Sequence, residues 1–457
     1  MNKILLLGAG RSASVLLDYL LVNASTFNWQ VAVGDVRVDH LARQVQQNPQ
    51  LRAFVFDVQD EAQRREEIGR AEVVISMLPA LFHPLVAQTC LDLEKHLVTA
   101  SYVPPQIKAM HAQAEAKGLT FLMECGLDPG IDHLSAMRLI HQIQGQGGTI
   151  TSFKSFTGGL MAPESDNNPW HYKFTWNPRN VILAGQGTAR YKQDGSYKYI
   201  PYPVLFRRTE TFLVEGFGYF DGYANRDSLG YLEPYGLEGI QTMLRGTLRR
   251  PGYCQAWQVL VHLGLTDDSY SLADSSHLTY GDLVRSFLPP SPESHLPLKE
   301  QVAAYLRIAP EVEELQLVEW TGLFDEVPID LENATPAQAL EKLLVQKWKL
   351  EPGDKDMIVM LHELEYEQEG DKRKCTSSLV VLGEDEVQTA MAKTVGLPLG
   401  IATKLLLQGK LQAKGVVVPL QPDLYLPILA ELEQYGIRFT EREEQTSDFG
   451  VISRNQA

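Results

Sequence analysis

Residues 3–13 read Lys3-Ile4-Leu5-Leu6-Leu7-Gly8-Ala9-Gly10-Arg11-Ser12-Ala13, and this stretch decides the fold of the first part of the chain. The apolar run predicts a short buried strand of a parallel sheet. Apolar residues at helical spacing follow it, from Val15 to Leu20. Gly8 suits a tight turn, Gly10 allows a pyrophosphate to approach the backbone, and Ala13 keeps the helix close to the strand. The helix start adds N–H groups and a partial positive charge. A G-x-G-x-x-A motif in this strand–turn–helix setting predicts a dinucleotide-binding domain.

The next predicted strand, Gln30–Val33, ends at Gly34-Asp35. An acidic residue roughly 20 residues beyond the glycine motif is placed to bind the ribose hydroxyls of NAD. Its charge would repel the 2′-phosphate of NADP, so we expect NAD. Arg37 lies nearby and could accommodate that phosphate, which leaves NADP as the less favoured cofactor.

Four more strands are expected at Phe54–Asp57, Val73–Ser76, His96–Ala100 and Leu119–Met123. Their alternation with helices predicts an α/β fold with a Rossmann-type, doubly wound parallel sheet. Asp57-Val58 is expected beside the adenine and Ser76–Pro79 beside the nicotinamide ribose, whereas the lone His83 is interpreted as structural. The predicted cofactor-binding residues are Gly8, Ala9, Gly10, Arg11, Ser12, Ala13, Asp35, Val36, Arg37, Asp57, Val58, Ser76, Met77, Leu78, Pro79 and Leu127.

Residues 124–133 read Glu-Cys-Gly-Leu-Asp-Pro-Gly-Ile-Asp-His and lie between a predicted buried strand and a predicted helix near residues 133–144. Open α/β sheets bind ligands at the carboxyl ends of their strands, where this loop belongs. Asp128, Asp132 and His133 concentrate acid–base chemistry in it. The alternative is that Asp132 only caps the helix and Asp-Pro-Gly is a turn.

The composition restricts the class of protein. A chain of 457 residues with 44% hydrophobic and 21% charged residues is expected to form two or three globular domains. The formal net charge of −16 disfavours a general nucleic-acid partner. We find no apolar run long enough for a membrane span and no signal-peptide pattern. The four scattered cysteines indicate neither disulfides nor a zinc site, and they suit the cytoplasm.

The sequence after the predicted helix near residues 133–144 differs from the regular alternation of strands and helices before it. An aromatic stretch includes Phe174 and Trp176, for which core packing is the default interpretation. An arginine cluster within Tyr219–Arg249 suggests an acidic ligand, unless these arginines pair with acids such as Asp227. Gln255 to about Lys349 is expected to be mostly helical. A strand follows at Asp356–Glu367, then helices at Val387–Leu407 and Tyr425–Tyr435.

Taken together, the motifs resemble the glutamate-forming saccharopine dehydrogenases, also called saccharopine reductases. They occur in the family's order as Gly8–Ala13, Ser76–Pro79, Thr99–Pro104, Glu124–His133, Gly158–Glu164, Tyr172–Trp176, Asn225–Ser228, Arg245–Arg249, Met391–Pro398 and Lys414–Val417. The resemblance implies a Rossmann domain (1–125 plus about 385–457), a mixed α/β substrate and dimerisation domain (126–254 and about 350–384) and a helical domain (255–349). It also implies a homodimer.

The reaction implied is oxidation of saccharopine at the carbon bearing its secondary amine, then hydrolysis of the imine to glutamate and 2-aminoadipate 6-semialdehyde, or the reverse. By motif position the substrate-binding residues are Ser101, Tyr102, Asp128, Arg226, Arg245, Thr247 and Arg249. Asp128 is the first candidate for proton transfer and His133 the second, which leaves Asp132 as the helix cap. NADP-using members of the family tend to carry a small neutral residue at the position of Asp35 followed directly by arginine. Here Val36 follows, which supports NAD and lysine breakdown.

Two other functions are compatible with the sequence. One is a related amine-forming reductase such as carboxynorspermidine dehydrogenase, whose substrate has fewer carboxylates to use Arg226 and Arg249. The other is a non-catalytic protein that senses NAD through a partner. A metal enzyme is disfavoured because no His, Cys and Asp grouping has ligand spacing.

Overall fold

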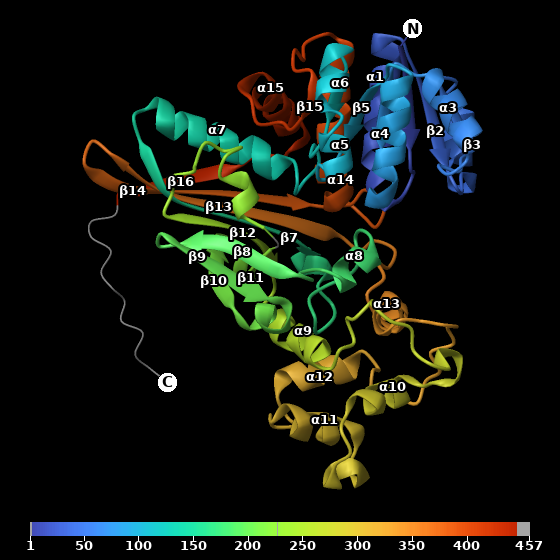
Figure 1. Cartoon of the computed structure of the whole chain (residues 1–457), viewed down its shortest axis with the longest axis vertical. Helices are drawn as coiled ribbons and strands as arrows, with labels where there is room; N and C mark the ends of the chain where they lie inside the picture. The colour runs from blue at the N-terminus through green and yellow to red at the C-terminus, as the bar shows by residue number, and fades with distance from the viewer. Residues whose placement is uncertain (1, 226, 446–457) are drawn as a thin grey trace. The chain divides into compact units, whose positions relative to one another are not determined.

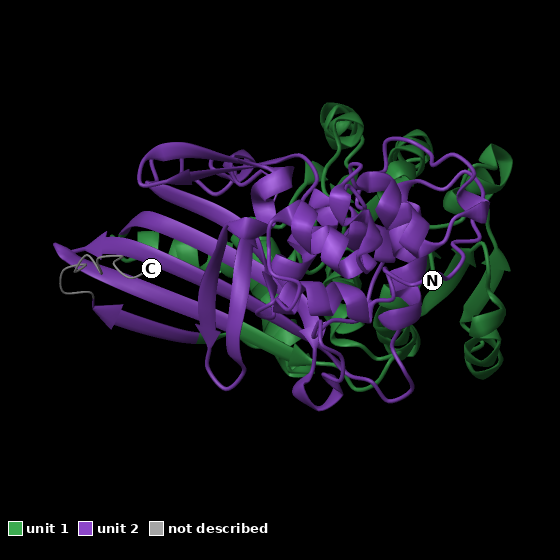
Figure 2. Ribbon diagram, turned by 90° about the horizontal axis from the view of Figure 1, so that it is seen from below, with its two compact units in different colours: residues 1–148, 379–440 green, residues 149–378, 441–457 purple. Residues whose placement is uncertain are grey.

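The structure is a computed structural model, and it describes residues 2–225 and 227–445. It divides into two compact units (Figure 2). Unit 1 comprises residues 1–148 and 379–440, and unit 2 comprises residues 149–378 with the segment that begins at 441. The division differs from the expected one at its first boundary, which falls at residue 148 instead of 125.

Unit 1 is built on a seven-stranded sheet in the order β15-β6-β5-β4-β1-β2-β3. The strands are β1 (Asn2–Leu7), β2 (Trp29–Asp35), β3 (Leu51–Val55), β4 (Val73–Ser76), β5 (His96–Thr99), β6 (Thr120–Leu122) and β15 (Gly415–Val417). All neighbouring pairs are parallel. The chain leaves β1 in one direction for β2 and β3 and in the other for β4 to β6, so right-handed crossovers place helices on both faces. The predicted doubly wound fold is confirmed (Figure 1).

One strand was misplaced by the sequence pattern. β3 begins at Leu51, three residues before the predicted start, and ends at Val55, so Asp57 lies beyond the strand. Pairing with β2 decides these bounds, because Val31 N–H donates to the Gln50 carbonyl and Phe56 N–H donates to the Asp35 carbonyl.

The helices of unit 1 are α1 (Ser14–Phe27), α2 (Ala42–Gln47), α3 (Glu61–Gly69), α4 (His83–Asp92), α5 (Pro105–Lys108), α6 (His111–Ala116), α7 (Ile131–Gly145), α14 (Ala390–Leu407) and α15 (Pro422–Leu432). α14 packs closely on α1, because a Cβ on Gly396 would lie 2.8 Å from the Leu16 nitrogen and one on Gly400 would lie 2.5 Å from the Tyr19 ring. Contrary to the sequence-based expectation, α14 is long and apolar enough to cross a membrane; 78% of that stretch is buried inside the protein. This burial makes it a core helix of unit 1.

The C-terminal part of the chain completes unit 1. β15 pairs with β6, and the Thr120 hydroxyl donates to the Ala413 carbonyl at 2.8 Å. α7 packs against α15, where His141 Nδ1 lies 2.9 Å from the Tyr425 hydroxyl. These contacts explain why residues 126–148 belong to unit 1.

Unit 2 contains a nine-stranded sheet whose main path runs β10-β11-β12-β7-β13-β14-β16, with β8 paired to β12 and to β9. The strands are β7 (Thr149–Met161), β8 (Thr188–Gln193), β9 (Ser196–Pro201), β10 (Thr209–Val214), β11 (Gly218–Ala224), β12 (Thr242–Arg249), β13 (Asp356–Gln368), β14 (Asp371–Leu382) and β16 (Thr440–Gln445). β12 runs parallel to β7 and antiparallel to β11. β11 and β12 were not expected from the sequence; each carries a glycine, Gly222 or Gly246, packed under the Phe156 ring.

The helices of unit 2 are α8 (Pro178–Ile182), α9 (Tyr253–His262), α10 (Tyr280–Phe287), α11 (Leu298–Leu306), α12 (Glu313–Trp320) and α13 (Pro336–Lys347). They share one hydrophobic cluster with the aromatic stretch, in which Trp170, Tyr172 and Phe174 pack with Trp257 and Trp348. The core role expected for Phe174 and Trp176 is confirmed: Phe174 is buried and Trp176 packs against the same cluster. This shared core joins the helical segment to the sheet in one compact unit.

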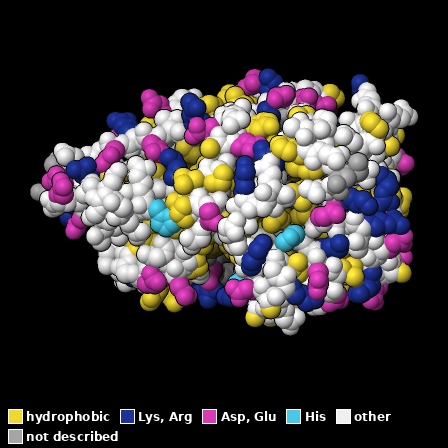
Figure 3. Space-filling model, turned by 90° about the horizontal axis from the view of Figure 1, so that it is seen from above, with side chains coloured by type: hydrophobic (Ala, Val, Ile, Leu, Met, Phe, Trp, Pro, Cys, Tyr) yellow, Lys and Arg dark blue, Asp and Glu magenta, His cyan; other side chains and the backbone are white. Residues whose placement is uncertain are grey.

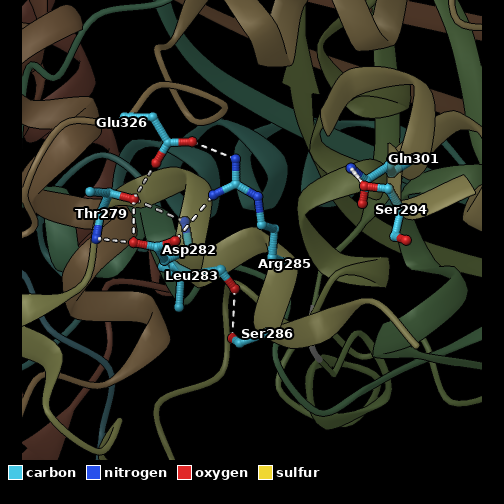
Figure 4. Close-up of polar contacts among 8 residues, drawn as sticks. All are labelled: Thr279, Asp282, Leu283, Arg285, Ser286, Ser294, Gln301 and Glu326. Atoms are coloured by element: carbon cyan, nitrogen blue, oxygen red, sulfur yellow. Dashed lines mark hydrogen bonds and ion pairs between the residues drawn. The ribbon is translucent and has the colours of Figure 1, made fainter. Parts of the chain in front are cut away.

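A polar network fixes the start of α10 (Figure 4). The Thr279 hydroxyl accepts from the Asp282 N–H at 3.0 Å, and the Asp282 carboxylate accepts from the Thr279 N–H at 3.2 Å, which is a reciprocal capping box. Arg285 pairs with Asp282 and with Glu326, so the cap is tied to the segment that follows α12.

Candidate active site

The glycine turn of unit 1 has the geometry of a phosphate-binding loop. Gly8 has φ +93°, and a Cβ there would lie 2.9 Å from the Met77 carbonyl group, so only glycine fits. The Gly8 N–H donates to the Gly34 carbonyl at 2.9 Å. By contrast, a Cβ on Gly10 would meet no atom within 4 Å. Gly10 therefore faces open space at the beginning of the helical turn Arg11–Ala13, as a bound pyrophosphate requires.

Asp35 lies beside this turn at the end of β2. Its Oδ2 accepts from the Ala9 N–H at 2.7 Å and its Oδ1 accepts from the Arg37 N–H at 3.0 Å. Two backbone amides thus hold an anionic side chain against the glycine loop.

The other predicted cofactor residues lie at the same edge of the sheet. Asp57 is exposed and its Oδ1 accepts from the Gln59 N–H at 2.9 Å. Val58 is 7% exposed and packs in the core below that edge, so its side chain is less available than predicted. Met77 and Leu78 are partly buried after β4, Pro79 is exposed, and Leu127 is buried.

In the loop after β6, Asp128 is accessible while its neighbours are buried. Every residue from 119 to 137 is buried except Asp128. The Tyr102 hydroxyl donates to Asp128 Oδ1 at 3.3 Å, so the structure brings two predicted substrate-binding residues together. Gly130 has φ +150°, and a Cβ there would lie 2.0 Å from the Gly126 carbonyl oxygen. This close backbone approach bends the loop so that Asp128 is presented at its surface.

The structure changes the roles expected for His133 and Asp132. His133 is fully buried, and its Nε2 lies 2.9 Å from Glu124 Oε2. Its second nitrogen lies 3.6 Å from Asp132 Oδ2. This burial favours a structural role for His133 over the proton transfer predicted for it. Asp132 is not the helix cap: Gly130 occupies that position, and Asp132 Oδ1 accepts from the Gly130 N–H at 2.6 Å.

Glu124 ties this cluster to the preceding loop. Its Oε1 accepts from the Val103 N–H at 3.1 Å, and its own N–H donates to the Ser101 carbonyl at 3.1 Å. The predicted substrate-binding residues Ser101 and Tyr102 are therefore anchored to the same loop as Asp128.

His83 connects the hydroxyl of Ser76, a predicted cofactor-binding residue, with that of Ser101, a predicted substrate-binding residue. Its Nδ1 lies 2.9 Å from Ser76 Oγ and its Nε2 lies 2.7 Å from Ser101 Oγ. Burial lowers the pKa of His83 to about 4, so the imidazole is neutral at pH 7. The only sequence signal for this bridge is the position of His83 at the start of α4, directly after the turn that follows Ser76.

His83 is expected to make stability depend on pH. Because its pKa is about 4 in the folded chain and 6.5 in the unfolded chain, the unfolded state binds more protons between these values. The free energy of unfolding should fall by about 2 kcal/mol more in the wild type than in His83→Gln when the pH is lowered from 7 to 5. Urea unfolding of both proteins at the two pH values measures this difference. Equal losses in the two proteins would contradict the assignment.

Unit 2 presents the arginine cluster on one face of β12. Arg245, Thr247 and Arg249 alternate along the strand, so their side chains point to the same side of the sheet. Arg245 is 8% exposed, and its guanidinium lies 4.0 Å from the centre of the Tyr231 ring. Arg226 lies outside the described residues. Asp227, the acid considered as a partner for these arginines, pairs instead with Arg190 at 2.5 Å.

Arg249 ends this face of the strand, and its Nη1 donates to the Leu248 carbonyl at 2.9 Å. It is 5% exposed, and its guanidinium lies 5.1 Å from the Tyr172 ring centre and 5.2 Å from that of Tyr253. Within residues 2–225 and 227–445 no carboxylate pairs with it, and its buried Nε has no hydrogen-bond partner. Asp221, its neighbour across the β11–β12 ladder, accepts from the Thr211 hydroxyl at 3.1 Å. A buried guanidinium is costly to the folded state when no carboxylate pairs with it.

No group of three or more His, Cys, Asp or Glu side chains in the described part of the chain could hold a metal ion. All four cysteines are buried, and burial raises the pKa of Cys125 and of Cys254 to about 12. Basic side chains stand next to acidic ones across the face shown in Figure 3.

Two family models match the chain. Residues 4–122 match the saccharopine dehydrogenase NADP binding domain, and residues 126–437 match the saccharopine dehydrogenase C-terminal domain. Together they cover both units and the loop that carries Asp128.

Curated proteins and solved structures give the same result. The chain is 35% identical to the bovine mitochondrial alpha-aminoadipic semialdehyde synthase over 451 residues, which is 96% of this chain and 47% of the bovine protein. It thus spans about half the length of that relative. It is 31% identical to the Saccharomyces cerevisiae saccharopine dehydrogenase [NADP(+), L-glutamate-forming] over 96% of this chain and 99% of the yeast protein. The apo structure of saccharopine dehydrogenase (L-Glu forming) from S. cerevisiae matches with a TM-score of 0.86 and 30% identity, over 97% of this chain and all of that chain.

Proposed function

The chain belongs to the saccharopine dehydrogenase family, and from this premise we propose that it catalyses the NAD-dependent oxidative cleavage of saccharopine to glutamate and 2-aminoadipate 6-semialdehyde. The reverse reaction condenses the same two products reductively. Oxidation removes a hydride from the carbon beside the secondary amine, and water then cleaves the resulting imine.

The observation that carries the proposal is the arginine face of β12. Saccharopine bears three carboxylates, and the buried Arg249 lacks a carboxylate partner in the described part of the chain. Arg245 and Thr247 point to the same side of the strand. We assign carboxylate recognition to these three side chains and to Arg226, each as a proposal for its own contact with the substrate.

Unit 1 supplies the cofactor chemistry in this proposal. The glycine loop Gly8–Ala13 and Asp35 would hold a nicotinamide dinucleotide, which would supply the hydride acceptor. In this proposal Asp128 takes the proton that the secondary amine must lose before hydride transfer and releases it to solvent. The carboxylate then takes the proton of the attacking water and passes it to the amine that leaves as glutamate. The Tyr102 hydroxyl, which donates to Asp128 Oδ1 at 3.3 Å, orients that carboxylate.

A steady-state assay with saccharopine tests the function. We expect reduction of NAD at a measurable rate, with glutamate formed in equal amounts. A folded protein that binds NADH but reduces neither NAD nor NADP in the presence of saccharopine would refute the proposal.

Cofactor choice is a separate prediction. The matching family model and the yeast relative both carry NADP in their descriptions, whereas the carboxylate of Asp35 beside the glycine loop favours NAD. We propose NAD on the second ground. Asp35→Ser should raise the ratio of kcat/KM for NADP to that for NAD by roughly a hundredfold, because it removes a repulsive charge. The matched control is Asp39→Ser, which removes an exposed charge four positions later. A wild type that prefers NADP, or an Asp35→Ser ratio equal to that of the control, would refute the assignment.

Further features of the family resemblance remain proposals. We propose a homodimer, lysine breakdown as the metabolic direction and a cytoplasmic location, the last on the scattered positions of the four cysteines in the sequence. The bovine relative is named as mitochondrial. The two other functions considered from the sequence, a carboxynorspermidine dehydrogenase and a non-catalytic NAD sensor, gain no support from the relatives.

A further inference from the structure

We propose that His83 is a positioning residue that turns the Ser101 hydroxyl into a hydrogen-bond donor for a carboxylate oxygen of the substrate. The inference rests on the proposed function for the identity of the substrate. The geometry of His83, Ser76 and Ser101 carries it, and all three lie in unit 1.

The three side chains form a chain of hydrogen bonds that runs from the core toward the surface. Ser76 and His83 are each 1% exposed, whereas Ser101 is partly exposed. Ser76 Oγ lies 2.9 Å from His83 Nδ1, and Ser101 Oγ lies 2.7 Å from His83 Nε2. The two bonds occupy both ring nitrogens of His83. Because Ser101 is the partly exposed end of these hydrogen bonds, it is the one of the three side chains that can contact a ligand.

The buried end of the chain sets the direction of its protons. Within the described residues, His83 Nδ1 is the only hydrogen-bond partner of the Ser76 hydroxyl. If Nδ1 carried the proton, the hydroxyl proton of Ser76 would be buried without an acceptor, which is costly. Ser76 therefore donates to Nδ1, and the imidazole carries its single proton on Nε2.

This tautomer makes the Ser101 hydroxyl a hydrogen-bond donor toward a ligand. The Nε2–H group donates to Ser101 Oγ, so the proton of that hydroxyl points away from His83. A hydroxyl that already accepts from an N–H group is a good donor, and an ionised carboxylate only accepts hydrogen bonds. The Ser101 hydroxyl is thus oriented to donate to a carboxylate oxygen. Without the bond from His83 the hydroxyl would rotate freely, and its proton would have no fixed direction.

The tautomer can be measured without any assumption about activity. We would record long-range ¹H–¹⁵N correlation spectra of the protein labelled with ¹⁵N-histidine at pH 7, and identify His83 by the resonances that disappear in His83→Gln. The expected result is a neutral ring with its proton on Nε2. A proton on Nδ1, or on both nitrogens, would overturn the inference even if saccharopine is the substrate.

Kinetics test the consequence for the substrate. His83→Met removes the donor to Ser101 and should raise KM for saccharopine about tenfold, while the Kd for NADH changes by less than twofold. His83→Gln places an amide N–H near the position of Nε2 and should restore KM to within about threefold of the wild type. Ser101→Ala should match His83→Met, and the double variant should be no worse than either single variant.

The results that would contradict a positioning role for His83 differ from those that would contradict the proposed function. Equal losses of NADH and saccharopine affinity in His83→Met, additive effects in the double variant, or no rescue by His83→Gln would show a merely structural histidine. Absence of saccharopine turnover in the wild type would refute the proposed function, and the NMR measurement would still decide the tautomer.

Discussion

Replacing Asp128 by asparagine is expected to lower kcat for saccharopine oxidation by about 10²–10⁴-fold, the range for loss of a general base. Asp128 is the one residue between 119 and 137 that is not buried, and Tyr102 donates to its carboxylate. Asparagine keeps the shape and the hydrogen bond from Tyr102 but cannot take a proton. Steady-state rates at saturating NAD and saccharopine measure the effect.

Binding measurements decide what the loss in Asp128→Asn means. Preserved affinity for saccharopine supports proton transfer, whereas lost affinity would make Asp128 an anchor for a substrate ammonium group. The matched control is Asp423→Asn, the same change at an exposed position in the first turn of α15, which should leave kcat unchanged. An Asp128→Asn enzyme that retains full kcat would refute the catalytic role.

The second large effect is expected at Arg249, where one substitution should weaken binding and strengthen the fold. Arg249→Met should raise KM for saccharopine roughly 30-fold or more, the cost of removing one partner of a buried charge pair. The same change should increase the free energy of unfolding of the ligand-free protein by about 1–3 kcal/mol, because a buried guanidinium without a carboxylate partner is replaced by an apolar chain. Urea unfolding and saccharopine kinetics measure the two effects.

The neighbouring arginine provides the control. Arg250 donates to the Phe217 carbonyl at 2.7 Å and lies over the Phe220 ring, one position beyond the arginine face of β12. Arg250→Met should leave KM for saccharopine unchanged. If Arg249→Met destabilises the ligand-free protein as much as Arg250→Met does, the guanidinium of Arg249 is structural and its assignment to the substrate fails.

The sequence predicts the structure best where the determining contacts are local. The first strand, the glycine turn and the helix that follows lie within Asn2–Phe27, and spacing alone places them. The sequence predicts the structure less well where pairing with distant segments decides the outcome, as at β3, whose bounds depend on β2. β12 was missed because arginines, threonines and Gly246 interrupt the apolar residues of Thr242–Arg249, and because this strand is stabilised by the distant β7 and by Phe156.

By itself, the sequence determined the class of this protein, a dinucleotide-binding α/β fold, and the positions of an acid-rich loop after its sixth strand and of an arginine cluster. These are properties of short segments, in which residue type and spacing set the conformation. Only the tertiary structure decided how these residues are buried and paired. It buried His133 between Glu124 and Asp132, left Asp128 accessible, placed His83 between Ser76 and Ser101, and left Arg249 without a carboxylate partner among the described residues. The physical reason is that burial and pairing depend on segments brought together from distant parts of the chain, and a side chain's reactivity depends on both.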